Sequence, residues 1–235
     1  MKSSRLATPL LLTLILGCSE KSVTPAAKVD TPAPATTSAS VDAGARNAYF
    51  GDLHVHTKYS FDAFIFGTTA SPDDAYRFAK GGKIVHPAGF EMQLNQPLDF
   101  YAVSDHGFYL GALPAMADPD QALSKHELAQ GLNLLGSDDI ARRAHVGRIL
   151  QLLQSDQRSE LFDDKVFKDA WNDSIAAANR HNDPGKFTTF IAYEFTASGD
   201  EFENLHRNVI FKGDKGPESP MTILDSINPE DLWDW

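Results

Sequence analysis

The most informative stretch of this 235-residue chain reads Gly51-Asp52-Leu53-His54-Val55-His56-Thr57-Lys58-Tyr59-Ser60-Phe61-Asp62. Its first half has the apolar character of a strand, and residues i and i+2 of a strand point to the same side. His54 and His56 can therefore present both imidazoles to one metal ion. Asp62 lies beyond the turn-like Tyr59-Ser60, from where a loop can bring its carboxylate to the same place. Two solvated histidines on a surface strand are the alternative, so the rest of the chain has to distinguish the two.

Composition restricts the class of protein. Hydrophobic residues make up 42% of the chain, which is enough for a sizeable core. The formal net charge of -11 argues against nucleic acid as the main partner and against electrostatic docking on anionic lipid. We therefore expect no nucleic-acid partner, and part of the negative charge is available to hold cations.

The N-terminal segment has the features of an export signal. Residues 1–18 combine Lys2 and Arg5 with an apolar run that is too short to span a bilayer. The following Gly17-Cys18 resembles the end of a bacterial lipobox, whose cysteine becomes lipid-modified. We expect an exported lipoprotein, tethered to a membrane at the periplasmic or cell-surface side by a lipid on Cys18; an ordinary cleaved signal is the alternative. Cys18 is the only cysteine, so metal ligands in the folded part must be nitrogen or oxygen.

The composition changes sharply after the signal. Residues 19–46 are rich in Ala, Ser, Thr and Pro and contain no aromatic residue, which predicts a disordered linker. Aromatic residues begin at Tyr49-Phe50, so we place the folded domain at residues 47–235. Within it, apolar runs alternate with segments of helical spacing, which predicts an α/β domain.

Four apolar runs predict strands, and each has a candidate ligand at or near one end. Residues 49–55 contain His54 and are followed by His56, and residues 98–104 are followed by Asp105-His106. Residues 188–192 lead into Tyr193-Glu194-Phe195, and His206 immediately precedes the fourth run. A buried carboxylate is costly unless it is paired or binds a metal, which favours a functional role for Glu194. The arrangement predicts a site at the carboxyl edge of a sheet.

Four segments have helical character. Ser71-Pro72-Asp73-Asp74 supplies an N-cap, a first-turn proline and two acids to a helix that runs to about Ala79. Residues 114–157 and 166–179 show helical spacing of apolar residues, and residues 228–232 predict a last helix start. Residues 84–96, which contain a proline and a glycine, predict a loop or a short hairpin.

The order of candidate ligands along the chain resembles that of the polymerase and histidinol phosphatase (PHP) superfamily. Three phrases resemble more specifically the bacterial domain-of-unknown-function family 3604: Tyr49-Phe50-Gly51-Asp52-Leu53-His54-Val55-His56, Pro72-Asp73-Asp74-Ala75-Tyr76 and Pro97-Leu98-Asp99-Phe100. The resemblance covers residues 47–235. It implies part of a distorted (β/α)7 barrel whose C-terminal portion is missing, because relatives supply a further histidine and a late Asp-x-His element.

The resemblance also implies roles for individual residues. The implied metal ligands are His54, His56, Asp62, His106, Glu194 and His206. Glu194 would bridge two ions and Asp105 would orient His106, which makes these two acids the catalytic candidates. Asp62 stands where many relatives have a histidine. Histidine nitrogens and carboxylate oxygens suit Zn, Mn or Fe, of which a complete protein would hold two or three ions.

These expectations together predict a metal-dependent hydrolase, phosphoesterase-like by resemblance, that activates water against a small-molecule phosphoester. An amidohydrolase-like enzyme that cleaves C–N bonds would use a similar His-x-His strand. A metallophosphoesterase fits less well, because Asp52-Leu53-His54 matches its Asp-x-His start but no Gly-Asn-His follows. The non-catalytic alternative is a metal-binding surface lipoprotein fragment.

Overall fold

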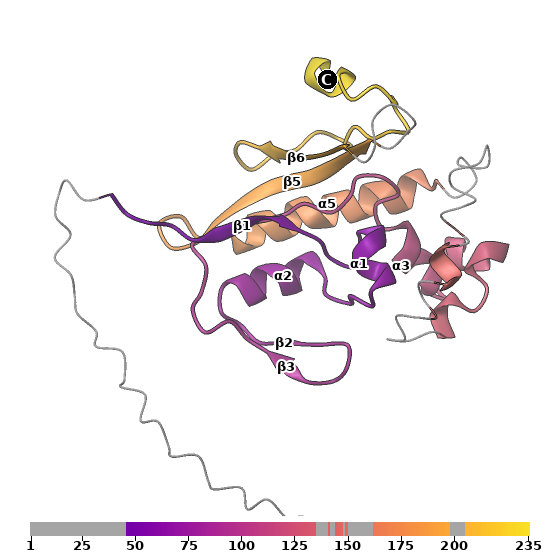
Figure 1. Cartoon of the computed structure of the whole chain (residues 1–235), viewed down its shortest axis with the longest axis horizontal. Helices are drawn as coiled ribbons and strands as arrows, with labels where there is room; N and C mark the ends of the chain where they lie inside the picture. The colour runs from indigo at the N-terminus through magenta and orange to yellow at the C-terminus, as the bar shows by residue number, and fades with distance from the viewer. Residues whose placement is uncertain (1–45, 135–140, 142–143, 148, 150–161, 198–204) are drawn as a thin grey trace, which may run out of the picture. The chain divides into compact units, whose positions relative to one another are not determined.

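A four-stranded sheet organises the folded part of the chain (Figure 1). The computed structural model describes residues 46–134, 141, 144–147, 149, 162–197 and 205–235. The expected signal, the lipobox cysteine and nearly all of the expected linker lie outside the described residues. Residues Asn47–Trp235 form one compact unit.

The fold is mixed α/β, and the strands of the sheet follow the order β1-β4-β5-β6. The parallel strands are β1 (Gly51–Val55), β4 (Phe100–Val103) and β5 (Thr188–Ala197). The fourth strand, β6 (Leu205–Phe211), is antiparallel to β5. The hairpin expected within residues 84–96 is confirmed as β2 (Ile84–Val85) and β3 (Glu91–Met92).

The sheet is strongly curled, so that its two edge strands approach each other. The side chain of Asn208 on β6 donates a hydrogen bond to the backbone carbonyl of Leu53 on β1 at 3.2 Å, although β4 and β5 lie between these strands in the sheet order. In a flat sheet with a spacing of about 4.8 Å, the edge strands would be roughly 14 Å apart. The curl therefore brings side chains from both edges to one place.

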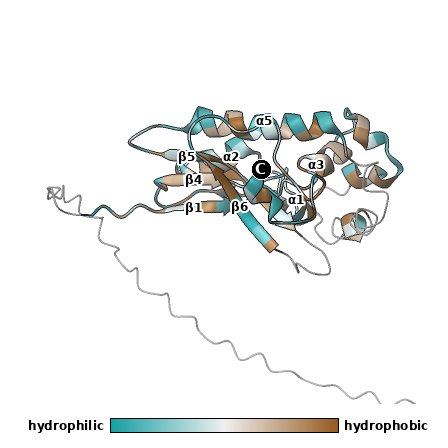
Figure 2. Cartoon of the chain, turned by 90° about the horizontal axis from the view of Figure 1, so that it is seen from above, coloured by the Kyte–Doolittle hydropathy of each residue, from teal (hydrophilic) through white to brown (hydrophobic). Residues whose placement is uncertain are grey.

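Helices α2 (Pro72–Ala79) and α5 (Asp164–His181) cover one face of the sheet. The shorter helices are α1 (Phe61–Ile65), α3 (Ala112–Ala117) and α6 (Asp231–Asp234). Figure 2 shows α2 and α5 on the same side of the strands, and both pack on β4. Trp171 of α5 meets Tyr193 of β5 with ring centroids 5.9 Å apart, and both side chains are buried. This aromatic layer forms the centre of the core.

The alternation of side chains along β5 separates the core from the other face of the sheet. Tyr193 and Phe195 belong to the core that α5 covers, so Glu194 and Thr196 point to the opposite face. The expectation that Glu194 marks a strand end is wrong, because β5 continues to Ala197. The reason is that β6 pairs with β5 along this whole stretch, through Ala197 opposite Leu205.

Other predicted elements differ in length. The described part of residues 114–157 contains α3 and three 3-10 turns, η1 (Ala122–Lys125), η2 (Glu127–Ala129) and η3 (Leu132–Leu134). Most of the helical run expected from residue 138 lies outside the described residues. The helix expected at 166–179 is confirmed as the longer α5. The last helix begins at Asp231, after a turn in which the Asn228 side chain donates a hydrogen bond to the Asp231 carboxylate.

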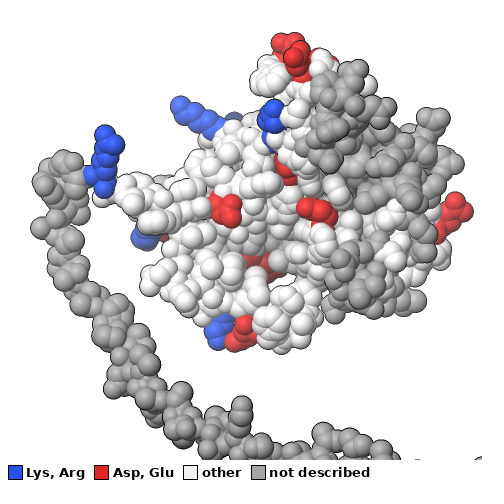
Figure 3. Space-filling model, in the orientation of Figure 1, with Lys and Arg blue, Asp and Glu red and all other residues white. Residues whose placement is uncertain are grey.

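Charged side chains are dispersed on the surface that Figure 3 shows. Among the described residues on this face, Lys and Arg stand apart from one another and form no continuous basic strip. In the described part of the chain, no helix combines the length and apolar character that a membrane span needs.

The predicted start of α2 is confirmed as a reciprocal cap. Ser71 Oγ accepts a hydrogen bond from the Asp74 backbone N–H at 3.2 Å, and the Asp74 carboxylate accepts one from the Ser71 N–H at 3.0 Å. Two backbone donors at the helix start are thereby satisfied.

Replacing Ser71 by alanine should lower the free energy of unfolding by about 1 kcal/mol, because the Asp74 N–H loses its acceptor. Urea denaturation of the folded domain measures the change. Ser71→Thr, which keeps a hydroxyl, should stay close to the wild type. A Ser71→Ala midpoint equal to that of the wild type would show that the cap contributes nothing.

Candidate metal centre

The structure brings the six expected ligands together around one carboxylate. They come from β1 and the loop after it (His54, His56), from the first turn of α1 (Asp62), from just beyond β4 (His106), from β5 (Glu194) and from β6 (His206). Each of the four histidines has a ring nitrogen within 3.3 Å of a Glu194 carboxylate oxygen. Glu194 is therefore the centre of the cluster.

One oxygen of Glu194 faces two imidazoles. Glu194 Oε2 lies 2.9 Å from His56 Nε2 and 3.3 Å from His54 Nε2. Both Glu194 Oε2 and His56 Nε2 are buried without a hydrogen-bond partner, so their 2.9 Å contact lacks hydrogen-bond geometry. Ligand atoms held about 2.0–2.2 Å from one ion would lie roughly 2.8–3.6 Å apart. The unpartnered atoms of this group therefore fit a bound cation.

The other edge of His56 is held by Asp62. His56 Nδ1 lies 2.9 and 3.0 Å from the two carboxylate oxygens, and Ser60 Oγ donates to Asp62 at 2.6 Å. A carboxylate on one nitrogen of a histidine directs the other nitrogen towards a metal. Asp62 Oδ2 is also 3.6 Å from His106 Nε2, so Asp62 can serve either as an orienting partner or as a ligand.

The second oxygen of Glu194 faces β6. Glu194 Oε1 accepts a hydrogen bond from His206 Nδ1 at 2.5 Å, while Oε2 lies 3.1 Å from His106 Nδ1. The two oxygens thus address different histidines, as a carboxylate that bridges two ions would. Three overlapping groups result: His54–His56–Glu194, His56–Asp62–His106 and His106–Glu194–His206.

The histidines keep the acids of the centre ionised. Burial opposes the charged form of Glu194, but His56, His106 and His206 outweigh it and lower its pKa to about 2. Burial also opposes ionisation of Asp62, yet the neighbouring His106 and His56 imidazoles hold its pKa well below the usual range. Burial disfavours the imidazolium of His56, but Asp62 and Glu194 raise its pKa to about 10.

Asp105 is placed differently from the five residues around Glu194. Its carboxylate is buried and accepts hydrogen bonds from the Thr57 N–H at 2.5 Å and from Thr57 Oγ1 at 2.7 Å. Burial raises its pKa to about 6, against the effect of those two bonds. Asp105 therefore holds the loop that follows His56. The hydrogen-bond partner of His106 Nδ1 is instead Thr196 Oγ1, at 2.6 Å.

The position of His106 is fixed by backbone pairing beyond β4. The Glu194 N–H donates to the Asp105 carbonyl, and the Gly107 N–H donates to the Glu194 carbonyl, both at 2.9 Å. A Cβ at Gly107 would lie 2.9 Å from the Tyr193 ring, so glycine permits this close approach. Phe61 stacks on the His106 ring with centroids 4.6 Å apart.

The centre is buried on one side and open on the other. The side chains of Glu194 and His106 are 1% and 4% exposed, whereas those of His54 and His206 are 54% and 41% exposed. A molecule from solvent would therefore reach the centre between His54 and His206.

Comparison with protein-family models gives a match to the family described as "Protein of unknown function (DUF3604)", over residues 43–235. The chain belongs to the DUF3604 family. The resemblance inferred from the sequence phrases is thereby confirmed at the level of this family. Searches of curated proteins and of solved structures gave no significant match.

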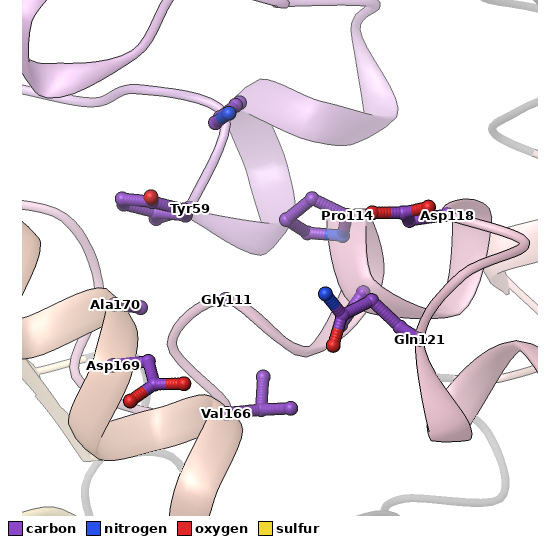
Figure 4. A pocket seen from close by; sticks show the side chains of 10 residues that line it. Tyr59, Gly111, Pro114, Asp118, Gln121, Val166, Asp169 and Ala170 are labelled. Carbon is purple, nitrogen blue, oxygen red and sulfur yellow. The ribbon is translucent and has the colours of Figure 1, made fainter.

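A cavity of about 350 Å³ lies beside the same loop of the DUF3604 domain (Figure 4). Lys58 and Tyr59, directly after His56-Thr57, line it together with residues of α3 and α5. The Tyr59 hydroxyl donates to Asp173 of α5 at 2.8 Å. None of the six clustered residues lines this cavity, so the loop after β1 contributes both to the cluster around Glu194 and to a separate cavity.

Replacing Thr57 by valine in this DUF3604 domain should lower the free energy of unfolding by about 1–3 kcal/mol, because a buried Asp105 oxygen loses its donor. Urea denaturation in the presence of a chelator measures this. Thr222→Val is the matched control, since Thr222 is also buried and donates to a less buried carboxylate, that of Asp225, at 3.2 Å. Equal losses in the two variants would contradict a particular importance of the Thr57–Asp105 bond.

Proposed function

We propose that this chain is a metal-dependent hydrolase of the PHP type that acts on small-molecule phosphoesters. The observation that carries the proposal is the buried Glu194 carboxylate, whose Oε2 has no hydrogen bond and faces the unpartnered Nε2 of His56. An ionised oxygen buried without a hydrogen bond is costly unless a positive charge lies beside it, and a metal ion would supply that charge. The curled sheet, with ligands on both edge strands, supports membership of the PHP superfamily and part of a (β/α)7 barrel.

The donor set favours a transition metal. Four imidazoles and two carboxylates suit Zn, Mn or Fe, whereas dedicated Ca or Mg sites consist mainly of oxygen ligands. His54, His56 and Glu194 would hold one ion, and the groups that contain His106 would hold a second.

Bound divalent ions would supply Lewis-acid chemistry, which makes water a better nucleophile and offsets negative charge on a phosphoryl group. The chain's own residues prepare the place for it. Glu194 stays ionised at neutral pH and holds the histidines around it, while Asp62 keeps the Nδ1 edge of His56 occupied. Asp105 and Thr57 fix the loop between them. The exposed His54 and His206 leave one side accessible to a substrate.

The substrate class rests on the superfamily resemblance and on charge. The net charge of -11 and the dispersed Lys and Arg side chains on the face of Figure 3 support a small molecule over a nucleic acid. Export as a lipoprotein, with a lipid on Cys18, remains part of the proposal because residues 1–45 lie outside the described part. Such a protein would hydrolyse its substrate outside the cytoplasm.

Addition of Zn²⁺ or Mn²⁺ to the metal-free protein should raise its Tm, because an ion that binds only the folded state adds about 2.7 kcal/mol at 100 times its Kd. His54→Ala should lose most of this rise, and a chelator should reverse it in the wild type. His86→Ala is the control, since His86 lies at the β2–β3 hairpin and stacks on Phe90. The metal assignment fails if the wild type binds no ion by elemental analysis.

Hydrolysis of a phosphoester panel with added Mn²⁺ or Zn²⁺ should fall more than about 100-fold in Glu194→Gln, because the metal contributes several kcal/mol to the transition state. His86→Ala should retain activity. Metal binding without turnover of any phosphoester would favour the non-catalytic alternative. Activity that persists in Glu194→Gln would remove Glu194 from the mechanism.

A further inference from the structure

We propose that the Thr196 hydroxyl is the positioning partner of His106 and commits this histidine to bind metal through Nε2, on the Asp62 side of the centre. The inference rests on the proposed metal centre and deepens it. It selects between two of the three overlapping groups, because His106 meets Asp62 through Nε2 but meets Glu194 through Nδ1.

His106 Nδ1 has two polar neighbours, but only one of them is its hydrogen-bond partner. His106 Nδ1 lies 2.6 Å from Thr196 Oγ1 in a hydrogen bond. The same nitrogen is 3.1 Å from Glu194 Oε2, but that oxygen has no hydrogen-bond partner. The Nδ1 edge of His106 is therefore engaged by the hydroxyl and not by the carboxylate, which leaves the Nε2 edge to face Asp62.

Burial protects the hydrogen bond between His106 and Thr196 from competition with water. His106 is 3% exposed and Thr196 is 9% exposed, so water does not readily replace either partner. On the ring face, Phe61 stacks on His106 at an interplanar angle of 17°. The ring is thus restrained in its plane by the hydroxyl and out of its plane by the phenyl group.

The strand explains why Thr196 is in the right place. Residues i and i+2 of a strand share a face, so Thr196 lies on the same face of β5 as Glu194. In the register of β5 with β6, Thr196 is opposite His206, whose Nδ1 is 3.4 Å from Thr196 Oγ1. The hydroxyl therefore lies between the Nδ1 atoms of two histidines.

The chemistry of a hydroxyl suits this position. A threonine hydroxyl both donates and accepts, whereas an ionised carboxylate only accepts. When Nε2 of His106 binds a cation, Nδ1 carries the ring proton and can donate it to Thr196 Oγ1. An outer partner of this kind fixes the ring tautomer and typically contributes 10- to 100-fold to metal affinity.

Zinc titration calorimetry of wild type, Thr196→Val, Thr196→Ala and Thr196→Ser tests the proposal. The two variants without a hydroxyl should bind Zn²⁺ about 10- to 100-fold more weakly, and Thr196→Ser should restore most of the affinity. Thr189→Val is the matched control on the same strand, because it removes a hydroxyl bond to the Ala178 carbonyl at 2.7 Å. Two hydroxyl-free variants of different size allow a poorly folded one to be recognised by circular dichroism.

Nitrogen NMR of the histidine rings gives a readout that a structural role would not move. In the Zn²⁺-loaded wild type, the His106 signals should show coordination at Nε2 and a proton at Nδ1. Coordination at Nδ1 would overturn the proposal. In a His106→Ala background, Thr196→Val should change the affinity no further, because Thr196 acts through His106.

The outcomes distinguish this inference from the proposed function. A wild-type protein that binds no Zn²⁺ overturns the proposed metal centre and the inference with it. If Thr196→Val and Thr196→Ala bind Zn²⁺ as tightly as the wild type does, the inference about Thr196 is wrong and the proposed metal centre still stands.

Discussion

A carboxylate buried in the middle of a sheet is the constraint on which the rest of this structure depends. Glu194 is 1% exposed and ionised, with its pKa lowered to about 2. Such a charge is tolerated only when positive or polar groups surround it. Four histidines from three other chain segments supply that environment. The positions of those segments can therefore be understood as ways of bringing nitrogen atoms to one carboxylate.

The topology meets this requirement by combining parallel and antiparallel pairing. The carboxyl ends of β1 and β4 lie at one edge of the sheet because both strands are parallel to β5. The antiparallel β6 adds its amino end at the same edge, which places His206 opposite Thr196. The curl that joins Asn208 to Leu53 then carries the edge strands towards Glu194. A flat sheet with the same strand order would leave His54 and His206 far apart.

The predictable parts of the fold and the site were those encoded locally. The His54-Val55-His56 alternation and the Ser71 cap each depend on a few neighbouring residues, and the structure contains both. The partner of Asp105 could not be inferred in the same way, because Thr57 lies 48 residues earlier and adjacency suggested His106 instead. The length of β5 also depended on a partner strand. Thr196 was missed for the same reason, since it lies in the part of β5 beyond the predicted strand.

The same cluster can balance its buried negative charge with a proton or with a cation. Without an ion, Glu194 and Asp62 are negative and His56, whose pKa is raised to about 10, carries a compensating proton. Metal binding requires a free imidazole nitrogen, so an ion must displace that proton. Proton and ion are therefore alternative sources of the positive charge that the buried acids demand. Burial of Glu194 makes a compensating positive charge necessary. The strand pairing that buries Glu194 also brings the histidines together.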